Sequence, residues 1–333
     1  EIYTLSLHDA LPISTSMALS RTTAAGGLEE DEGGYDAMAY GCQSMTGEIR
    51  SVLLKRVSEA FISQKNLDAT YEAFRYLGCP NYEKAAAEYA AFAKIIEEHV
   101  PEVHYLPEDD RTGLDSIYTH DPLKVTKKGA VYFPMGKPLR GREWMASKAY
   151  LESIGIPTLG RIEAPGKMEG GDVVWLDEKT VAIGRGYRTN DEGIRQFREL
   201  TKDFVERFIV VPMPHGEGED ACLHLMSVIS MIDRDLAVVY SKFMPVFFRE
   251  LLLERGIRLL EVDDEEYERL GSNVLALAPR VCLALGGNPR IKASLEGEGC
   301  KVYTYEGYNL SYLGTGGPDR KSTRLNSSHQ PLS

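Results

Sequence analysis

The feature that most constrains the fold is an internal repeat, in which a short apolar strand, a helix and a second strand recur along the chain. Four clear copies span residues 130–159, 181–212, 236–262 and 281–305. A looser fifth copy opens the domain, with strands at 51–57 and 102–106. Five such units predict an α/β fold closed into a ring.

The helical segments of these units carry apolar residues at i, i+3 and i+4, which is the pattern of a helix with one buried face. Gly155, Gly256 and Gly299 end three of the segments, where a left-handed helix cap is expected. The same pattern also fits a doubly wound open sheet. The periodicity alone leaves this alternative open.

The two ends of the chain are set aside from the fold. Residues 1–14 and 320–333 resemble translated sequencing-adapter peptides and are interpreted as artefacts. Residues 15–44 contain few large apolar side chains and are expected to form a flexible arm. The remaining segment, 45–319, is expected to be one catalytic domain that is truncated at its C-terminal end.

Composition excludes several classes of function. The formal net charge is -12 and no run of Lys or Arg interrupts it, so a nucleic-acid partner is not expected. No segment approaches the roughly 18 to 20 apolar residues that span a bilayer, so no membrane partner is expected either. The five cysteines are scattered without metal-ligand spacing, which indicates reduced thiols in a cytoplasmic protein. These cysteines are Cys42, Cys79, Cys222, Cys282 and Cys300.

Polar residues recur at equivalent places ahead of the first strand of each unit. A ring of repeats would bring such residues together in one pocket around the axis. Each has a simpler explanation when taken alone, as a turn, a capping carboxylate or a core histidine. Taken together, carboxylates and an imidazole without a metal motif suit a planar guanidinium cation. The segments concerned are 115–121, 168–172, 224–227, 271–273 and 314–318.

Three of these segments carry a resemblance to a known family. MEGGD at 168–172, HLMS at 224–227 and GTGGP at 314–318 resemble the guanidino-group-modifying (pentein) superfamily, with its arginine deiminases, amidinotransferases and dimethylarginine dimethylaminohydrolases. The resemblance covers roughly residues 45–319. It implies a five-bladed αβ propeller with pseudo-symmetric units around a central site, a small-molecule guanidino substrate and no cofactor or metal.

The resemblance also implies roles for the acidic residues and the histidine. His224 matches the general acid and base of the family, and Glu169 lies beside it to orient substrate or hold a proton. Asp121 is expected to grip the substrate guanidinium. Asp115 and Asp172 are expected to be further substrate contacts.

Two arginines match family residues that bind the carboxylate of the substrate. Arg188 is the better match, and Arg140 is a weaker one with Arg142 as its rival. Deiminases and amidinotransferases commonly place Asp two residues after the histidine, where this chain has Met226. A less polar site favours an N-methylated substrate, so dimethylarginine hydrolysis to citrulline and an alkylamine is the expected reaction.

The nucleophile that this reaction needs is not where the resemblance predicts it. The family has Cys where this chain has Arg320, after Gly-Gly-Pro and the intervening Asp319. Cys222 is an unlikely replacement and is interpreted as a buried apolar residue. The chain as it stands is therefore expected to bind guanidines without turnover. Amidino transfer, arginine deimination and a non-catalytic binding scaffold are the alternatives, and a homodimer is possible.

Overall fold

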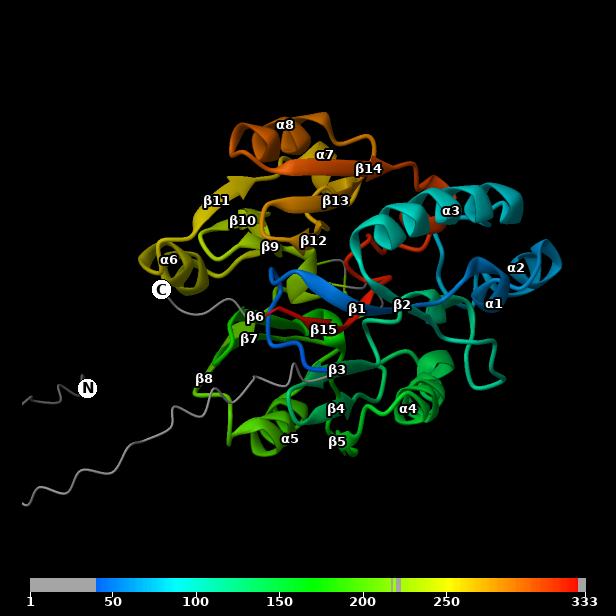
Figure 1. Cartoon of the computed structure of the whole chain (residues 1–333), viewed down its shortest axis with the longest axis horizontal. Helices are drawn as coiled ribbons and strands as arrows, with labels where there is room; N and C mark the ends of the chain where they lie inside the picture. The colour runs from blue at the N-terminus through cyan, green and yellow to red at the C-terminus, as the bar shows by residue number, and fades with distance from the viewer. Residues whose placement is uncertain (1–39, 217, 220–222, 329–333) are drawn as a thin grey trace, which may run out of the picture. The chain divides into compact units, whose positions relative to one another are not determined.

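The strands form five separate three-stranded sheets in the computed structural model, which describes residues 40–216, 218–219 and 223–328 (Figure 1). These residues belong to one of the two units into which the chain divides, Met38–Ser333. The interpretations of residues 1–14, of most of 15–44, of Cys222 and of 329–333 lie outside the described residues.

Every sheet is built in the same way. A central strand pairs in parallel with the strand that follows its helix, and antiparallel with a third strand on its other side. The central and parallel strands are the two strands of each predicted repeat, so the five αβ units are confirmed and a single open sheet is excluded. In the order antiparallel, central, parallel, the sheets are β15 (Thr323–Ser327), β1 (Ile49–Leu54), β2 (Glu102–Tyr105); β3 (Leu123–Thr126), β4 (Gly129–Tyr132), β5 (Thr158–Arg161); β6 (Val173–Asp177), β7 (Thr180–Arg185), β8 (Arg207–Pro212); β9 (Ile229–Asp233), β10 (Leu236–Val239), β11 (Arg258–Glu261); and β12 (Leu275–Ala278), β13 (Val281–Leu285), β14 (Lys301–Tyr305).

The antiparallel strand of each sheet was not part of the predicted repeat. In four sheets it directly precedes the central strand and forms a hairpin with it. In the first sheet it is β15, which comes from the far end of the chain and pairs with β1, Val52 lying opposite Arg324. Residues 323–327 therefore form a buried strand, although the sequence led us to set residues 320–333 aside from the fold.

The connecting helices lie on the outer side of the sheets (Figure 1). Asn81 and Asn190 cap two of them, because each side chain accepts a hydrogen bond from a backbone N–H in the first turn. Gly155, Gly256 and Gly299 have φ of +87°, +75° and +79°, which confirms the predicted left-handed caps. The helices are α1 (Val57–Ala60), α2 (Gln64–Thr70), α3 (Tyr82–His99), α4 (Glu143–Ser153), α5 (Asp191–Thr201), α6 (Val246–Glu254), α7 (Asp264–Glu268) and α8 (Pro289–Gly297).

Apolar clusters lie between the sheets and their helices. The longest helix, α3, buries Tyr89, Phe92 and Ile96 in the cluster that also contains Tyr305 and Leu310. Burying such side chains stabilises the unit by about 1.5–3 kcal/mol each. Apolar packing therefore holds the helices against the sheets. The polar groups lie at the starts of the antiparallel strands instead. Among the described helices, none is both long and apolar enough to cross a membrane.

Polar segments occupy the same place in all five units. Asp121, Asp172, Ser227, Asn273 and Ser322 each stand one or two residues before the antiparallel strand of their sheet. The contacts between units bring these strand starts together, since β15 contacts β3, β9 contacts β12, and the turn at 170–172 contacts the turn at 225–227. The fold thus places five polar segments beside one another.

Candidate functional site

A buried histidine and glutamate form the first pair of the candidate site. His224 Nε2 lies 2.7 Å from Glu169 Oε2, and both side chains are fully buried. Burial alone would raise the pKa of Glu169, but the hydrogen bond from His224 and the charge of Arg188 hold it well below its usual value. Glu169 is therefore ionised and accepts a hydrogen bond from His224 Nε2–H.

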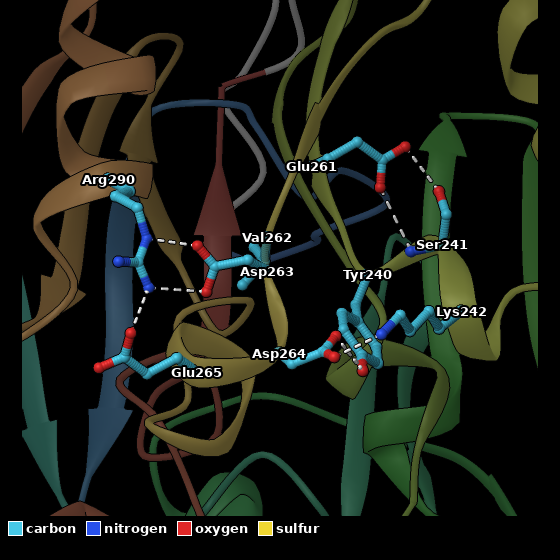
Figure 2. Close-up of a pocket in the computed structure, with 9 residues that line it drawn as sticks. All are labelled: Tyr240, Ser241, Lys242, Glu261, Val262, Asp263, Asp264, Glu265 and Arg290. Carbon is cyan, nitrogen blue, oxygen red and sulfur yellow. Dashed lines mark hydrogen bonds and ion pairs between the residues drawn. The ribbon is translucent and has the colours of Figure 1, made fainter.

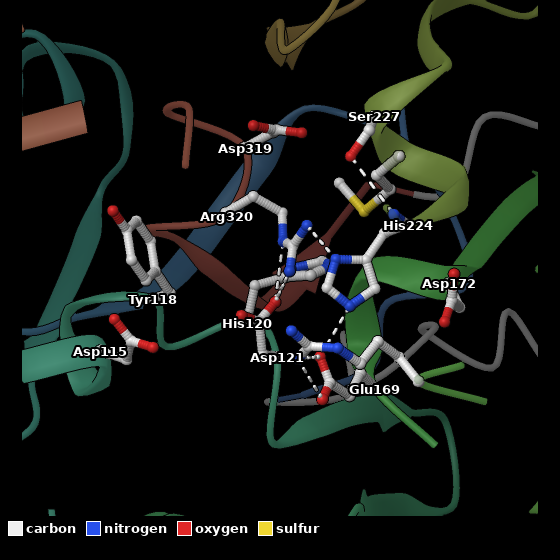
Figure 3. Close-up of polar contacts among 12 residues, drawn as sticks. Asp115, Tyr118, His120, Asp121, Glu169, Asp172, His224, Ser227, Asp319 and Arg320 are labelled. Carbon is white, nitrogen blue, oxygen red and sulfur yellow. Dashed lines mark hydrogen bonds and ion pairs between the residues drawn. The ribbon is translucent and has the colours of Figure 1, made fainter. Parts of the chain in front are cut away.

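The other ring nitrogen of the histidine faces Arg320 (Figure 3). Arg320 Nη1 donates to His224 Nδ1 at 2.7 Å. Because a guanidinium can only donate, Nδ1 accepts and the proton of the neutral imidazole sits on Nε2. The histidine thus bridges a carboxylate on one side and a guanidinium on the other.

Asp121 holds the same guanidinium. Arg320 donates to Asp121 Oδ1 through Nε at 2.8 Å and also through Nη2. The other oxygen, Oδ2, accepts from Arg140 Nη1 at 2.8 Å. Burial would raise the pKa of Asp121, but Arg320 and Arg140 outweigh it and hold the pKa well below its usual value. This carboxylate is ionised, and each of its oxygens accepts hydrogen bonds from a different arginine.

Arg140 is buried behind Asp121. Its Nε and Nη2 donate to Glu143 Oε2 at 3.0 and 2.9 Å, and Nη2 also donates to the Tyr118 carbonyl at 3.2 Å. Burial raises the pKa of Glu143 to about 7, although Arg140 opposes that rise. In this structure Arg140 therefore contacts two carboxylates of the chain, with 3% of its surface exposed.

The Gly-Gly pair of the MEGGD segment makes room for these groups. A Cβ on Gly171 would lie 2.6 Å from Arg320 Cζ, and one on Gly170 would lie 2.1 Å from the carbonyl oxygen of His120. Real Cβ atoms do not come this close, so a side chain at position 170 would collide with the backbone and one at position 171 would displace the Arg320 guanidinium. The backbone turn forms a flat floor on which the planar guanidinium rests.

Asp172 joins the neighbouring segments. Its Oδ1 accepts from the backbone N–H of Leu225 at 3.0 Å, and Oδ2 accepts from Thr189 Oγ1 at 2.6 Å. Burial raises the pKa of Asp172. Because Leu225 follows His224 and Thr189 follows Arg188, these bonds fix the position of both side chains.

Arg188 contacts the far side of Glu169. Its Nη1 donates to Oε1 at 3.0 Å and to Oε2 at 3.3 Å. The backbone N–H of Gly136 donates to Oε1 at 2.7 Å, and a Cβ there would crowd both Glu169 and Arg188. Glu169 is therefore held by a histidine, an arginine and a backbone amide.

Asp115 lies apart from this cluster (Figure 3). Its Oδ2 pairs with Lys137 Nζ at 2.7 Å, and Lys137 also donates to the carbonyl of Phe74 at 2.8 Å. Lys137 is 23% exposed whereas Asp115 is 3% exposed, so this pair leads from the interior to the surface. The sequence did not single out Lys137.

Two further residues next to the site, Asn273 and His120, lie in segments that the sequence analysis expected at the pocket, although no role was assigned to either residue. Asn273 donates to Asp319 Oδ2 at 3.1 Å, which links the fifth unit to the segment after GTGGP. His120 Nε2 and Lys124 Nζ lie 2.5 Å apart and form a hydrogen bond. Burial lowers the pKa of Lys124 to about 7. Asp319 is 46 residues away from Asn273, so no local pattern could have revealed that contact, whereas Lys124 follows His120 by only four residues.

The described cysteines occupy other places. Cys42 lies beside Ser327, Cys79 is exposed next to Asp68, and Cys282 and Cys300 are buried in the fourth apolar cluster. Burial raises the pKa of the Cys282 thiol. Within the described ranges, no group of three or more His, Cys, Asp or Glu side chains is arranged to hold a metal ion.

A surface cavity of about 550 Å³ lies away from this cluster (Figure 2). Its charged side chains pair with one another, as Arg290 does with Asp263 and Glu265, and Lys242 with Asp264. None of the site residues predicted from the sequence lines it. Because its charged side chains pair with one another, this cavity does not indicate a particular ligand.

Comparison with known proteins agrees with the geometry. A family model described as arginine deiminase matches residues 115–255, which include every predicted site residue. The uncharacterized protein YkgA of Bacillus subtilis is 26% identical over 264 residues, 78% of this chain and 86% of that protein. The dimethylarginine dimethylaminohydrolase of Pseudomonas aeruginosa is 25% identical over 240 residues, 62% of this chain and 91% of that enzyme.

Solved structures show the same fold. The Pseudomonas aeruginosa dimethylarginine dimethylaminohydrolase in complex with citrulline superposes with a TM-score of 0.66 at 21% identity, covering 84% of this chain and 100% of that one. An amidinotransferase of the saxitoxin pathway from Microseira wollei gives 0.71 at 15% identity, covering 88% and 99%. The chain is thus an α/β propeller of five units.

Its fold is that of the guanidino-group-modifying (pentein) superfamily, and its sequence resembles the dimethylarginine dimethylaminohydrolases and arginine deiminases of that superfamily.

Proposed function

We propose that the site recognises the guanidinium group of an arginine-like small molecule, and that this scaffold serves to hydrolyse that group. The carrying observation is that a guanidinium, that of Arg320, rests on Asp121 and His224 in the centre of the site. Similarity to enzymes named for dimethylarginine and arginine supports the same substrate class.

In this proposal Asp121 grips the substrate guanidinium through Oδ1, and Glu169 keeps His224 oriented through Nε2. His224 acts as general acid and base at Nδ1, the nitrogen that faces the centre. Arg140 positions Asp121 from behind, a different role from the carboxylate contact that the resemblance implied, because its guanidinium is already held by Asp121 and Glu143.

Arg188 and Asp115 remain the candidates for contact with the amino-acid part of the substrate. Arg188 is 6% exposed and held by Glu169, so it would have to share its guanidinium between Glu169 and the substrate carboxylate. Asp115 is paired with the more exposed Lys137, which gives the substrate a polar contact toward the surface. Asp172 supports the site indirectly through Leu225 and Thr189.

The reaction needs a nucleophile at position 320. A thiol there would give its proton to His224 Nδ1, and the thiolate would attack the guanidino carbon. His224 would then protonate the departing amine as the C–N bond breaks. Water would add to the thiouronium carbon with its proton going to His224, and the C–S bond would break to release citrulline and restore the thiol.

Arg320 cannot act in this way. A guanidinium stays protonated in proteins and has no free electron pair for attack. We therefore propose that the chain as it stands does not turn the substrate over, and that a cysteine in place of Arg320 completes the site.

Dimethylarginine is our preferred substrate. Met226 is buried two residues after His224, its side chain packs in an apolar cluster, and it lines a small cavity with His120 and Asp319. An apolar side chain at this place favours N-methyl groups over the bare nitrogens of arginine.

The test is the single change Arg320→Cys, which leaves β15 in place. Incubation with dimethylarginine should release citrulline and dimethylamine. The matched control Arg320→Ser has a similar size but a weaker nucleophile, and it should release neither.

Other outcomes would redirect the assignment. Ammonia release from arginine would indicate a deiminase. Turnover only when an acceptor amine is added would indicate an amidinotransferase. Inactivity of a folded Arg320→Cys protein toward both dimethylarginine and arginine, with and without an acceptor amine, would refute the hydrolase proposal and favour a binding scaffold.

A homodimer and a cytoplasmic location remain predictions. Sedimentation would check the oligomeric state, and localisation of a tagged protein would check the compartment.

A further inference from the structure

The side chain of Arg320 points into the protein although arginines are usually exposed. Only 4% of its surface is accessible. Burying a guanidinium is costly unless its donors are paired with a charged partner. Arg320 meets this condition because Nε and Nη2 both reach the ionised Asp121.

The surroundings of this guanidinium match its shape. Gly171 lies against its flat face, where a Cβ would be 2.6 Å from Cζ and 2.7 and 2.8 Å from the two terminal nitrogens. Asp121 lies at one edge and His224 at another. A flat floor and acceptors at the edges are what a planar cation with several donors requires.

This arrangement has a consequence for any other guanidinium. A ligand that binds to Asp121 Oδ1 needs the oxygen that Arg320 already occupies, and it would bring a second positive charge within a few ångströms. Such like charges repel strongly at a buried site. A guanidinium ligand and the Arg320 side chain therefore exclude each other.

The neighbouring residues hold Arg320 in place. Lys321 Nζ donates to Ser311 Oγ at 2.9 Å and to the carbonyl of Gly316, and β15 pairs with β1. A tethered group competes at an effective concentration that is about millimolar or higher. A weakly binding free ligand would not displace it.

We propose that Arg320 is an internal ligand that fills the guanidinium site, and that removing its side chain leaves a site that binds small guanidinium cations. This inference rests on the proposed guanidinium site. It adds that the site is already occupied by the chain itself, and that the occupant can be replaced by a free cation of the same chemistry.

The experiment uses Arg320→Ala in the full chain with ethylguanidinium, which supplies the atoms that the substitution removes. Ligand is present throughout thermal unfolding, so entry into the buried site is not limiting. Saturating ethylguanidinium should raise the Tm of Arg320→Ala by roughly 5 °C and leave that of the parent protein unchanged. Ethylammonium has the same charge without the planar fork and should have little effect.

Arg324→Ala is the matched control, because Arg324 is also buried in this segment. Among the described residues, its guanidinium donates to backbone carbonyls and to no carboxylate: to Gly47 at 2.8 Å, to Met45 at 2.5 Å and to Ala276. Without a carboxylate, the space it leaves should bind ethylguanidinium far more weakly. Equal stabilisation of both variants would show a nonspecific effect and overturn the proposal.

A second measurement does not depend on the folding of these variants. In the parent protein, the Nε–H of Arg320 should exchange slowly with solvent in ¹⁵N NMR, with its signal assigned by its loss in Arg320→Lys. Exchange at the rate of an exposed arginine would refute internal occupancy.

The two proposals can fail separately. Rescue of Arg320→Ala without turnover by Arg320→Cys would keep the guanidinium site and refute the hydrolase. Turnover by Arg320→Cys without rescue of Arg320→Ala and without slow exchange would keep the hydrolase and refute the internal occupancy by Arg320.

Discussion

Asp121→Asn should destabilise the protein strongly, because Asp121 is the acceptor for two buried arginines. Oδ1 takes Nε and Nη2 of Arg320, and Oδ2 takes Nη1 of Arg140. An amide keeps one acceptor oxygen and places N–H donors against the donors of an arginine. It also removes the negative charge that both guanidinium groups need.

The magnitude follows from burial. The side chains of Asp121 and Arg140 are 2% and 4% exposed, so solvent screens their pair little. Removing one partner of such a buried pair costs about 3–5 kcal/mol. For a domain of this size, that corresponds to a fall in Tm of roughly 10 °C.

The pH dependence has a definite sign. The pKa of Asp121 is lowered in the folded protein, so its contribution to stability is fully present above the unfolded pKa of about 4 and is lost as pH falls through the folded pKa. The difference in stability between the parent and Asp121→Asn should thus be largest at neutral pH and shrink below about pH 4.

Thermal unfolding followed by circular dichroism measures this difference. Asp177→Asn is the matched control, since Asp177 and its partner Arg255 are 29% and 27% exposed and their pair should contribute about 1 kcal/mol or less. If Asp121→Asn cost no more than Asp177→Asn, the buried ion-pair network would not exist in solution as described.

Two further substitutions test neighbouring parts of the site. Gly171→Ala places a methyl group 2.6 Å from Arg320 Cζ and should cost about 1–3 kcal/mol in thermal unfolding, whereas Gly297→Ala, with nothing within 4 Å of the new Cβ, should be neutral or slightly stabilising. Equal effects of the two changes would mean that Gly171 is not the floor of the site. Burial lowers the pKa of Lys321 to about 7, so folding stability should rise with pH between about 7 and 10 as the unfolded state binds the extra proton. Lys321→Met should reduce this rise, measured as Tm at pH 7 and 9, and an unchanged rise would show that Lys321 is solvated.

Much of the fold could be predicted because its elements produce patterns over short stretches of sequence. Apolar strands, amphipathic helices and capping glycines such as Gly155 each depend on neighbouring residues, and the repeat multiplies the signal five times. The pairing of β15 with β1 was missed, because it joins segments about as far apart as the chain allows and β15 carries Thr323, Arg324 and Asn326 rather than an apolar pattern.

The residues of the candidate site could be predicted from the sequence, but the side chains that they contact could not. The segments containing Asp121, Glu169 and His224 could be recognised, and the structure brings these side chains together. The contacts of Arg140 depend on the turn of η2 (Pro138–Arg140) into α4, which places Glu143 against its guanidinium. The inward direction of Arg320 depends on space above Gly171, which no single segment of sequence specifies.

The measurement that tests the central claim most directly is a crystal structure of Arg320→Ser with dimethylarginine. The account predicts the guanidinium of the ligand on Asp121, above Gly171 and beside His224 Nδ1, with its central carbon next to the side chain of residue 320. A ligand bound elsewhere, or a folded site that stays empty at high ligand concentration, would contradict the account.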